Sequence, residues 1–437
     1  MNMSSDFRHL ELATDETRMG EIFHRHAARL LPASGTLQHV YVSRVFPRGR
    51  GGFVIQYELH FKLPHASSAD SQVVCAELLP HGAAWPAYVQ QHPDRVLLQA
   101  DLGLVVPIFP FDPELNSLAD WASPDRASVQ LHEALEPLGG AWSGVKHSVL
   151  SQLQVLSYRL ARRCTLRYDL AWHAGNGSRP ASRTVIGRLS RPGTRAAQSE
   201  AVQAAVAEGR SSRSLPESLW ITPLVTQSAT GVELFPLAPG KSLHELTGHP
   251  SLVPACKATG AVLAQIHSHR GQEGTRNTHS ETETLRRQVA LVSEIFPGLA
   301  SRFREALESW EQKTALAGNT VTLIHGDFYD KQVLYSPEGV TVLDCDTLSF
   351  GDPALDVGNF CAHLTLRALQ HPEDQAHLRL ARGAFEEGYS AGRHESMEPR
   401  RFWEAATLLR LAALYALRPR WRRITPALLE ESKQCLE

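Results

Sequence analysis

The sequence is short of paired cysteines, and that shortage excludes two kinds of site. Its 437 residues include six cysteines, and no two of them have the close spacing typical of disulfide frameworks or zinc sites. The six are Cys75, Cys164, Cys256, Cys345, Cys361 and Cys435. We therefore expect neither structural disulfides nor a zinc centre, and we expect a reducing cytoplasm as the location.

The sequence also lacks a large net charge of either sign and long apolar runs. The formal net charge is −2, and no long surface alternates basic with aromatic residues, so we expect no nucleic-acid partner. No secretory leader and no run of about 20 apolar residues is recognisable, so we expect no membrane partner. The composition, with 43% hydrophobic and 21% charged residues, is typical of a globular protein, and the length favours two or three domains.

The most informative stretch spans residues 321–359. It opens with an apolar run, residues 321–324, which predicts a short buried strand, and the sequence His-Gly-Asp follows it. Two further β-type runs, residues 332–335 and 340–343, are separated by Ser-Pro-Glu-Gly. Proline and glycine between two such runs predict a tight turn, so we expect the runs to pair as a hairpin.

A hairpin brings its open ends together, so three polar side chains should converge at one mouth. Asp327 and Gln332 lie just before the first hairpin strand, and Asp344 lies just after the second. Such a cluster suits phosphoryl transfer, because Mg²⁺ prefers carboxylate and amide oxygens, and a further carboxylate can accept the proton of an attacking hydroxyl.

The order His-Gly-Asp-x4-Gln, hairpin, Leu-Asp, Gly-Asp-Pro-x-x-Asp resembles the pattern of the aminoglycoside phosphotransferase and choline kinase family. The resemblance implies an α+β, bilobal, protein-kinase-like fold with a β-rich N-lobe and a helical C-lobe. It implies transfer of the γ-phosphate of ATP or GTP to a hydroxyl of a small-molecule substrate, with Mg²⁺. By position, Asp327 would be the catalytic base, and Gln332 (where the family has Asn) and Asp344 would hold the metal.

Three more polar residues of this stretch are expected to brace its loops, namely His325, Asp352 and Asp356. For Asp352 the alternative is a helix cap, because Pro353 and a helix-like segment follow it.

A working N-lobe is expected within residues 150–240, with a strand pair over the nucleotide, as the resemblance implies. The family's phosphate-binding lysine position falls on Arg188, which keeps the positive charge; an exposed strand arginine is the alternative. Glu200, in a strongly helix-forming segment, is its expected ion-pair partner. Leu237 and Ala238 are expected to face the adenine at the hinge.

A self-match at an offset of 111 residues runs through the N-terminal half. Residues 51–61 align with residues 162–172, and residues 73–78 align with residues 184–189 without a gap. An offset kept across two strands and the loop between them indicates two copies of one β-unit. The alternative is a chance match between strands of similar alternation.

Three domains are therefore expected: an N-terminal α/β module (1–140), an N-lobe (150–240) and a C-lobe (241–437). The module would duplicate the N-lobe, cap or regulate the site, or mediate oligomers. Because Arg188 and Gln332 depart from the family pattern, a catalytically weak or inert kinase-like binding module with a regulatory role is the alternative function.

Overall fold

The structure, a computed structural model, describes most of the chain. The described residues are 7–32, 35–49, 51–64, 69–173, 180–193, 207, 219–271, 277–318, 320–393 and 398–437. They fall into two compact units. The N-terminal unit comprises residues 7–193 and Thr222–Leu237, and the C-terminal unit comprises Ala238–Glu437 with residues 207 and 219–221.

The first sheet of the N-terminal unit has five antiparallel strands in the order β1-β2-β3-β5-β4. Alternation along β2 places Phe53, Ile55, Tyr57 and Leu59 on one buried face, and the ring of Phe23 on α2 meets Tyr57 edge-on. The elements are α1 (Arg8–Ala13), α2 (Glu16–Arg25), α3 (Ala27–Leu30), β1 (Thr36–Arg48), β2 (Gly52–Lys62), β3 (Asp70–Leu78), α4 (Ala87–Gln91), β4 (Val96–Gln99) and β5 (Leu104–Pro107).

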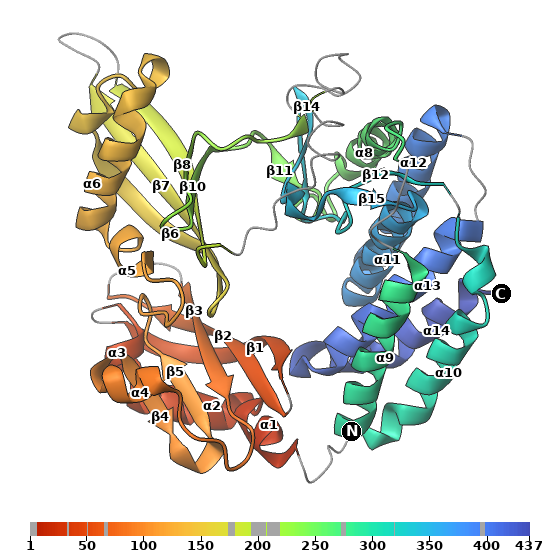
Figure 1. Ribbon diagram of the computed structural model, residues 1–437, viewed down its shortest axis with the longest axis horizontal. Coiled ribbons are helices and arrows are strands. Elements are labelled where there is room, and N and C mark those ends of the chain that lie inside the picture. Colours follow the sequence, from red (N-terminus) through yellow and green to blue (C-terminus); the bar gives the residue numbers. More distant parts are fainter. Residues whose placement is uncertain are drawn as a thin grey trace. The chain divides into compact units, whose positions relative to one another are not determined.

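The second sheet of this unit has the order β6-β7-β8-β10-β9. Its β7 buries Cys164, Leu166, Tyr168 and Leu170 in one core with apolar residues of α5 and α6, and α6 lies across the sheet in Figure 1. The elements are α5 (Leu118–Trp121), α6 (Pro124–Leu135), β6 (Val149–Arg159), β7 (Arg163–His173), β8 (Pro180–Ser190), β9 (Val225–Gln227) and β10 (Val232–Pro236).

The strand registers confirm the predicted repeat. Tyr57 of β2 pairs with Val74 of β3, and Tyr168 of β7 pairs with Val185 of β8, so both partners are shifted by the same 111 residues. The order of strands is also the same in both sheets, with the fifth strand inserted between the third and the fourth. A chance likeness of alternating strands would not reproduce both order and register.

A buried hydrogen bond recurs in the two copies as well. The Tyr57 hydroxyl donates to the Ala13 carbonyl at the end of α1 (2.6 Å), and the Tyr168 hydroxyl donates to the Trp121 carbonyl at the end of α5 (2.8 Å). In each copy a second helix then begins three residues later and precedes the first strand. The elements that the two copies share are therefore two helices followed by five strands, to which the first copy adds the short helices α3 and α4.

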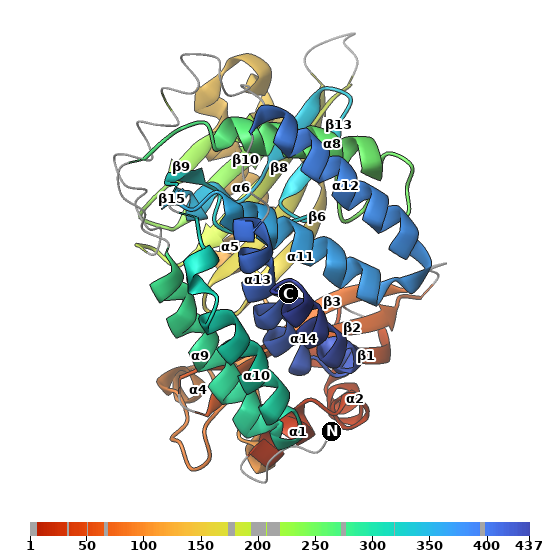
Figure 2. The ribbon, with the colours of Figure 1, turned by 90° about the vertical axis from the view of Figure 1, so that its right-hand side faces the viewer.

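The C-terminal unit is mainly helical. Figure 2 shows α8 beside α12 and α9 beside α10, as their contacts require. In α8 and α12 the backbones approach closely, because a Cβ at Gly260 would collide with the Phe385 carbonyl and a Cβ at Gly388 with the Lys257 carbonyl. The helices are α8 (Leu252–Ile266), α9 (Thr278–Ile295), α10 (Ala300–Glu311), α11 (Ala354–Gln370), α12 (Gln375–Gly392), α13 (Glu398–Ala416) and α14 (Thr425–Gln434).

Short strands complete this unit. They are β11 (Lys241–Ser242), β12 (Thr322–Ile324), β13 (Val333–Ser336), β14 (Gly339–Val342) and β15 (Ser349–Gly351). Of these, β12, β13 and β14 lie where the stretch 321–359 predicts them, whereas β11 and β15 were not predicted. With a β-rich unit and a helical unit, the chain has the predicted α+β architecture, and the N-terminal residues form the predicted β-rich module. No helix among the described residues is both long and apolar enough to cross a membrane.

Candidate active site

The predicted hairpin forms and brings its two ends together. β13 and β14 pair antiparallel, with Ser336 opposite Gly339 across the turn. At the open end, the Leu343 amide donates to the Gln332 carbonyl (2.8 Å). Gln332 and the residue before Asp344 are therefore direct neighbours, although the hairpin separates them in the sequence.

The loop that carries Asp327 is held by a buried carboxylate. The His325 and Gly326 amides donate to the two oxygens of Asp356 (2.6 and 2.8 Å), and the imidazole of His267 lies 3.2 Å from the same carboxylate. Gly326 has φ +80°, which favours glycine. Burial acts to raise the pKa of Asp356, but His267 and the His325 amide and ring outweigh burial and hold that pKa below its usual value.

His325 connects this loop to the far end of the hairpin. Its Nε2 lies 2.9 Å from the Leu343 carbonyl, and its own carbonyl accepts a hydrogen bond from Thr347 Oγ1 (2.7 Å). Asp344 follows directly with φ 57° and ψ 51°, a left-handed backbone conformation that non-glycine residues adopt at a cost. The segment after β14 is thus turned sharply at the residue predicted to hold metal.

Asp352, which directly follows β15 near the end of the same stretch, also accepts several hydrogen bonds. It accepts hydrogen bonds from the Trp403 indole (2.6 Å), the Gly318 amide (2.8 Å) and the Ala354 amide (2.9 Å). The last of these bonds lies at the first residue of α11. Asp352 therefore both contacts the start of a helix and ties β15 to α13.

The donor set of the mouth suits a hard cation. Gln332 offers an amide oxygen and Asp344 a carboxylate, and the hairpin places their backbones side by side. Among the described residues, the one group of three His, Cys, Asp or Glu side chains with ligand atoms within 4.8 Å of one another is His371, Glu373 and Asp374. That group lies on the surface between α11 and α12, and an acidic surface cluster does not by itself indicate a metal site.

A second buried carboxylate, close to the loop that carries Asp327, was not predicted from the sequence. Asp330 accepts hydrogen bonds from Arg367 Nε and Nη2 (2.7 and 3.3 Å), and its other neighbours are His244 and His363. Burial alone would raise the pKa of Asp330, but Arg367 and His244 lower it below its usual value. Its signal in the sequence was the row Asn359, His363, Arg367, spaced by four residues on one face of α11.

Asn359, at the start of that row, connects the catalytic loop to α13. Its Nδ2 donates to the Phe328 carbonyl (2.8 Å), and its Oδ1 accepts from Arg410 Nη2 (2.8 Å). The residue after Asp327 is thus held from the α11 side, as His325 and Gly326 are held by Asp356.

Arg188 lies in the N-terminal unit and is largely buried, so it is not an exposed strand arginine. Its Nε and Nη2 donate to Glu233 Oε2 (3.0 and 2.5 Å), directly across the β8–β10 register, and its guanidinium lies 5.3 Å from the Phe235 ring centre. Sequence reasoning missed Glu233, because the pairing of β8 with β10 cannot be read from local pattern. Glu200 lies outside the described residues.

The predicted hinge coincides with the boundary between the two units, which falls between Leu237 and Ala238. The Leu237 amide donates to the Thr184 carbonyl (3.4 Å), while the side chain is exposed. Gly240 has φ +96°, and a Cβ there would collide with the Tyr335 carbonyl, so this turn requires glycine.

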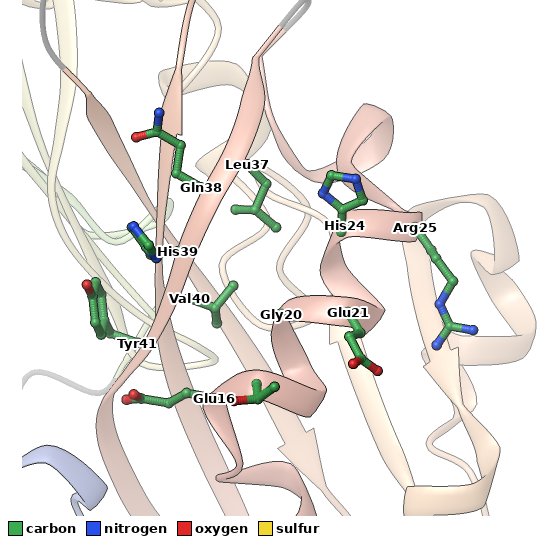
Figure 3. A pocket seen from close by; sticks show the side chains of 11 residues that line it. Glu16, Gly20, Glu21, His24, Arg25, Leu37, Gln38, His39, Val40 and Tyr41 are labelled. Carbon is green, nitrogen blue, oxygen red and sulfur yellow. The ribbon is translucent and has the colours of Figure 1, made fainter.

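A sizeable cavity lies elsewhere, in the first sheet's half of the N-terminal unit. It has a volume of about 770 Å³, and its side chains come from α2 and β1, including Glu21, His24 and Tyr41 (Figure 3). None of the predicted site residues lines it. Size alone therefore does not indicate the active site of this chain.

Comparison with known proteins gives one match to a family model. Residues 168–403 match the model described as the phosphotransferase enzyme family. No curated protein matches the chain significantly.

Solved structures resemble the chain more distantly. A macrolide 2'-phosphotransferase from Brachybacterium faecium shares 24% identity, with 64% of this chain and 94% of that chain covered and a TM-score of 0.37. A choline/ethanolamine kinase family protein from Mesorhizobium loti shares 15% identity over 72% and 94%, with a TM-score of 0.43. An amicoumacin kinase in complex with AMP-PNP and Ca²⁺ shares 14% identity over 64% and 88%, with a TM-score of 0.45.

Proposed function

Because the chain belongs to the phosphotransferase enzyme family, we propose that it transfers the γ-phosphate of ATP or GTP to a hydroxyl of a small molecule in a Mg²⁺-dependent reaction. The observation that supports this most is the construction of the stretch 321–359. Two separate braces, Asp356 on one side and Asn359 on the other, hold the loop that carries Asp327. Such bracing is what a catalytic group needs, because reacting groups must be held in position.

Asp327 is proposed as the base. Its carboxylate accepts the proton of the acceptor hydroxyl while the hydroxyl oxygen forms a bond to the γ-phosphorus and the bond from that phosphorus to the bridging β–γ oxygen breaks. The nucleoside diphosphate is the leaving group. The proton then passes from Asp327 to water.

Gln332 and Asp344 are proposed to hold the metal, since each side chain offers a hard oxygen and the Gln332 backbone is hydrogen-bonded to Leu343, the residue before Asp344. When bound, Mg²⁺ would neutralise charge on the nucleotide phosphates. Arg188 is proposed to bind phosphate oxygens, and Glu233 to hold its guanidinium in place. Leu237 and Ala238 are proposed to contact the nucleobase of the bound nucleotide.

The test compares nucleotide binding with turnover in Asp327→Asn. We expect calorimetry to show Mg²⁺-dependent nucleotide affinity within about twofold of the natural chain, and turnover lower by roughly 10²–10⁴, the range of general base catalysis. Slow hydrolysis without acceptor provides the turnover assay before the acceptor is known. Asp120→Asn, at an exposed position on α5, is the matched control and should leave both quantities unchanged.

Unchanged hydrolysis in Asp327→Asn would contradict the proposed base. The natural chain should also be screened with hydroxylated metabolites as acceptors. If it binds nucleotide but shows neither hydrolysis nor phosphate transfer to any of them, the alternative of an inert regulatory kinase-like module is favoured. The observation that favours this alternative is the ion pair of Arg188 with Glu233, because it already neutralises the positive charge proposed to bind phosphate.

A further inference from the structure

A second cavity lies inside the N-terminal unit, between the first sheet and the turn that joins β6 to β7. Its volume is about 160 Å³. The first sheet contributes Arg48, Gln56 and Cys75, and the turn contributes Arg159 and Arg162. All of these residues belong to one compact unit.

The repeat explains how this cavity arose. With the shift of 111 residues, Gln56 and Cys75 correspond to Arg167 and Ile186 on the face of the second sheet that also carries Arg188. In the first sheet this face is filled by the β6–β7 turn of the second copy. The residue that corresponds to Arg188 is Glu77, which pairs with Arg48 (3.2 Å), so the first copy lacks the cation that a nucleotide phosphate would meet.

Arginine side chains are the charged groups that line this space. They are Arg159, Arg162 and Arg48, the last of which already pairs with Glu77; at the wall, Asp112 and Arg44 act on the Cys75 thiol with opposite signs. Two carboxylates lie nearby: Glu77 pairs with Arg48 and accepts from Tyr88, while Asp112 accepts from the Tyr158 hydroxyl and the Ala161 amide, which leaves Arg159 and Arg162 as the cations that line the cavity outside the Glu77 pair. Guanidinium groups bind phosphate oxygens in fork geometry, so an anion is the favoured occupant.

One polar atom in the wall also needs a donor. Gln56 Oε1 is buried and has no hydrogen-bond partner among the described residues. A buried acceptor without a partner costs stability, and a ligand hydroxyl would relieve that cost. The wall therefore presents guanidinium donors and one acceptor to the same small space.

The volume limits the size of the occupant. It equals roughly five water molecules at about 30 Å³ each, and it is well below the ~300 Å³ of pockets that enclose drug-sized ligands. We propose that this cavity binds a small phosphate-bearing molecule, with Arg48, Arg159 and Arg162 around the phosphate and Gln56 Oε1 accepting a hydrogen bond from a ligand hydroxyl. The site is independent of the proposed phosphotransfer.

The test is calorimetric titration of the full chain, without Mg²⁺ or nucleotide, with inorganic phosphate, glycerol 3-phosphate and glycerol. We expect saturable binding of the phosphates and none of glycerol. Arg162→Glu should weaken phosphate binding by about tenfold or more, equivalent to about 1.4 kcal/mol. Arg126→Glu, on the exposed face of α6, is the matched control and should bind as the natural chain does.

Gln56→Leu identifies the source of the phosphate. If glycerol 3-phosphate binds more tightly than inorganic phosphate, and Gln56→Leu weakens its binding, the natural ligand is a phosphorylated metabolite. If inorganic phosphate binds more tightly than glycerol 3-phosphate, the natural ligand is the free phosphate ion. Thermal melting of each variant verifies folding. Absence of saturable phosphate binding, or equal binding by folded Arg162→Glu and the natural chain, would overturn the proposal.

Discussion

At the scale of single residues, the stretch 321–359 contains buried charges that have partners. Asp356 and Asp330 are almost completely buried, and each is stabilised as an anion by cationic or N–H donors. Burying a charged pair costs desolvation free energy, so its net contribution to stability is small. Removing one partner destabilises the protein more than that net contribution, because the other charge is left buried and unpaired. Their role is to hold the loop between them in one geometry.

His363 predicts how acid affects the protein. Burial lowers its pKa to about 3, even though Asp330 nearby opposes the shift, while an unfolded chain titrates near its usual value of about 6.5. Between these values the unfolded state binds the proton that the folded state does not, so stability falls as pH falls from about 6.5 toward 3. At neutral pH this contribution is fully present.

Urea unfolding at a series of pH values checks this prediction. From pH 6.5 to 4 the natural chain should lose up to about 3 kcal/mol more stability than His363→Gln. His279→Gln, at an exposed position on α9, should follow the natural chain. Parallel pH profiles for the natural chain and His363→Gln would refute the assignment.

At the scale of elements, the β6–β7 turn shows how the two copies are joined. Asp112, in the segment between β5 and α5, accepts the Tyr158 hydroxyl (2.8 Å) and the Ala161 amide (2.9 Å). The same carboxylate accepts the amides of Glu114 and Leu115. Ala161 has φ 57°, a conformation that a tight external contact must maintain.

Asp112→Ala should therefore destabilise the N-terminal unit. Two or more buried donors would lose their acceptor, so we expect a loss of about 3 kcal/mol, seen as a lower urea midpoint. Asp120→Ala removes only an exposed ion pair with Arg126 and should cost less than about 1 kcal/mol. Equal midpoints for the two variants would show that Asp112 does not hold the turn.

At the scale of the whole molecule, the two copies of the repeat lie in one compact unit. The two copies are in apolar contact, because Cys75 of the first sheet belongs to the core of the second, together with Tyr158 and Leu160. Helices α5 and α6, which precede residue 141, cover the buried face of β7. The proposed domains 1–140 and 150–240 are thus one folding unit in physical terms.

A chain that begins at residue 141 should therefore fail to fold. Loss of Trp121, Leu131 and Leu135 would expose the apolar face of the second sheet, and such a patch favours aggregation. Size-exclusion chromatography and near-ultraviolet circular dichroism, with the full chain as reference, check this outcome. A monodisperse shorter chain with ordered aromatic signals would show that the second lobe is autonomous.

The sequence by itself determined the features that depend on local pattern. Alternation and turn residues predicted the hairpin between residues 332 and 343, the fixed offset predicted the repeat, and the compound motif predicted the family and the kinase-like fold. These succeed because period, turn chemistry and spacing are written in neighbouring residues. The roles of Asp327, Gln332, Asp344 and Arg188 stay predictions that the proposed experiments address.

Only the tertiary structure decided which distant residues became partners. Glu233 beside Arg188, Asp330 beside Arg367, and the β6–β7 turn against the first sheet each join segments far apart in the chain. Strand register and helix packing set these pairings, and both depend on the whole core. The cavity between the first sheet and the β6–β7 turn, proposed to bind phosphate, is the clearest case. Its wall comes from two copies of the same unit, and neither copy alone contains it.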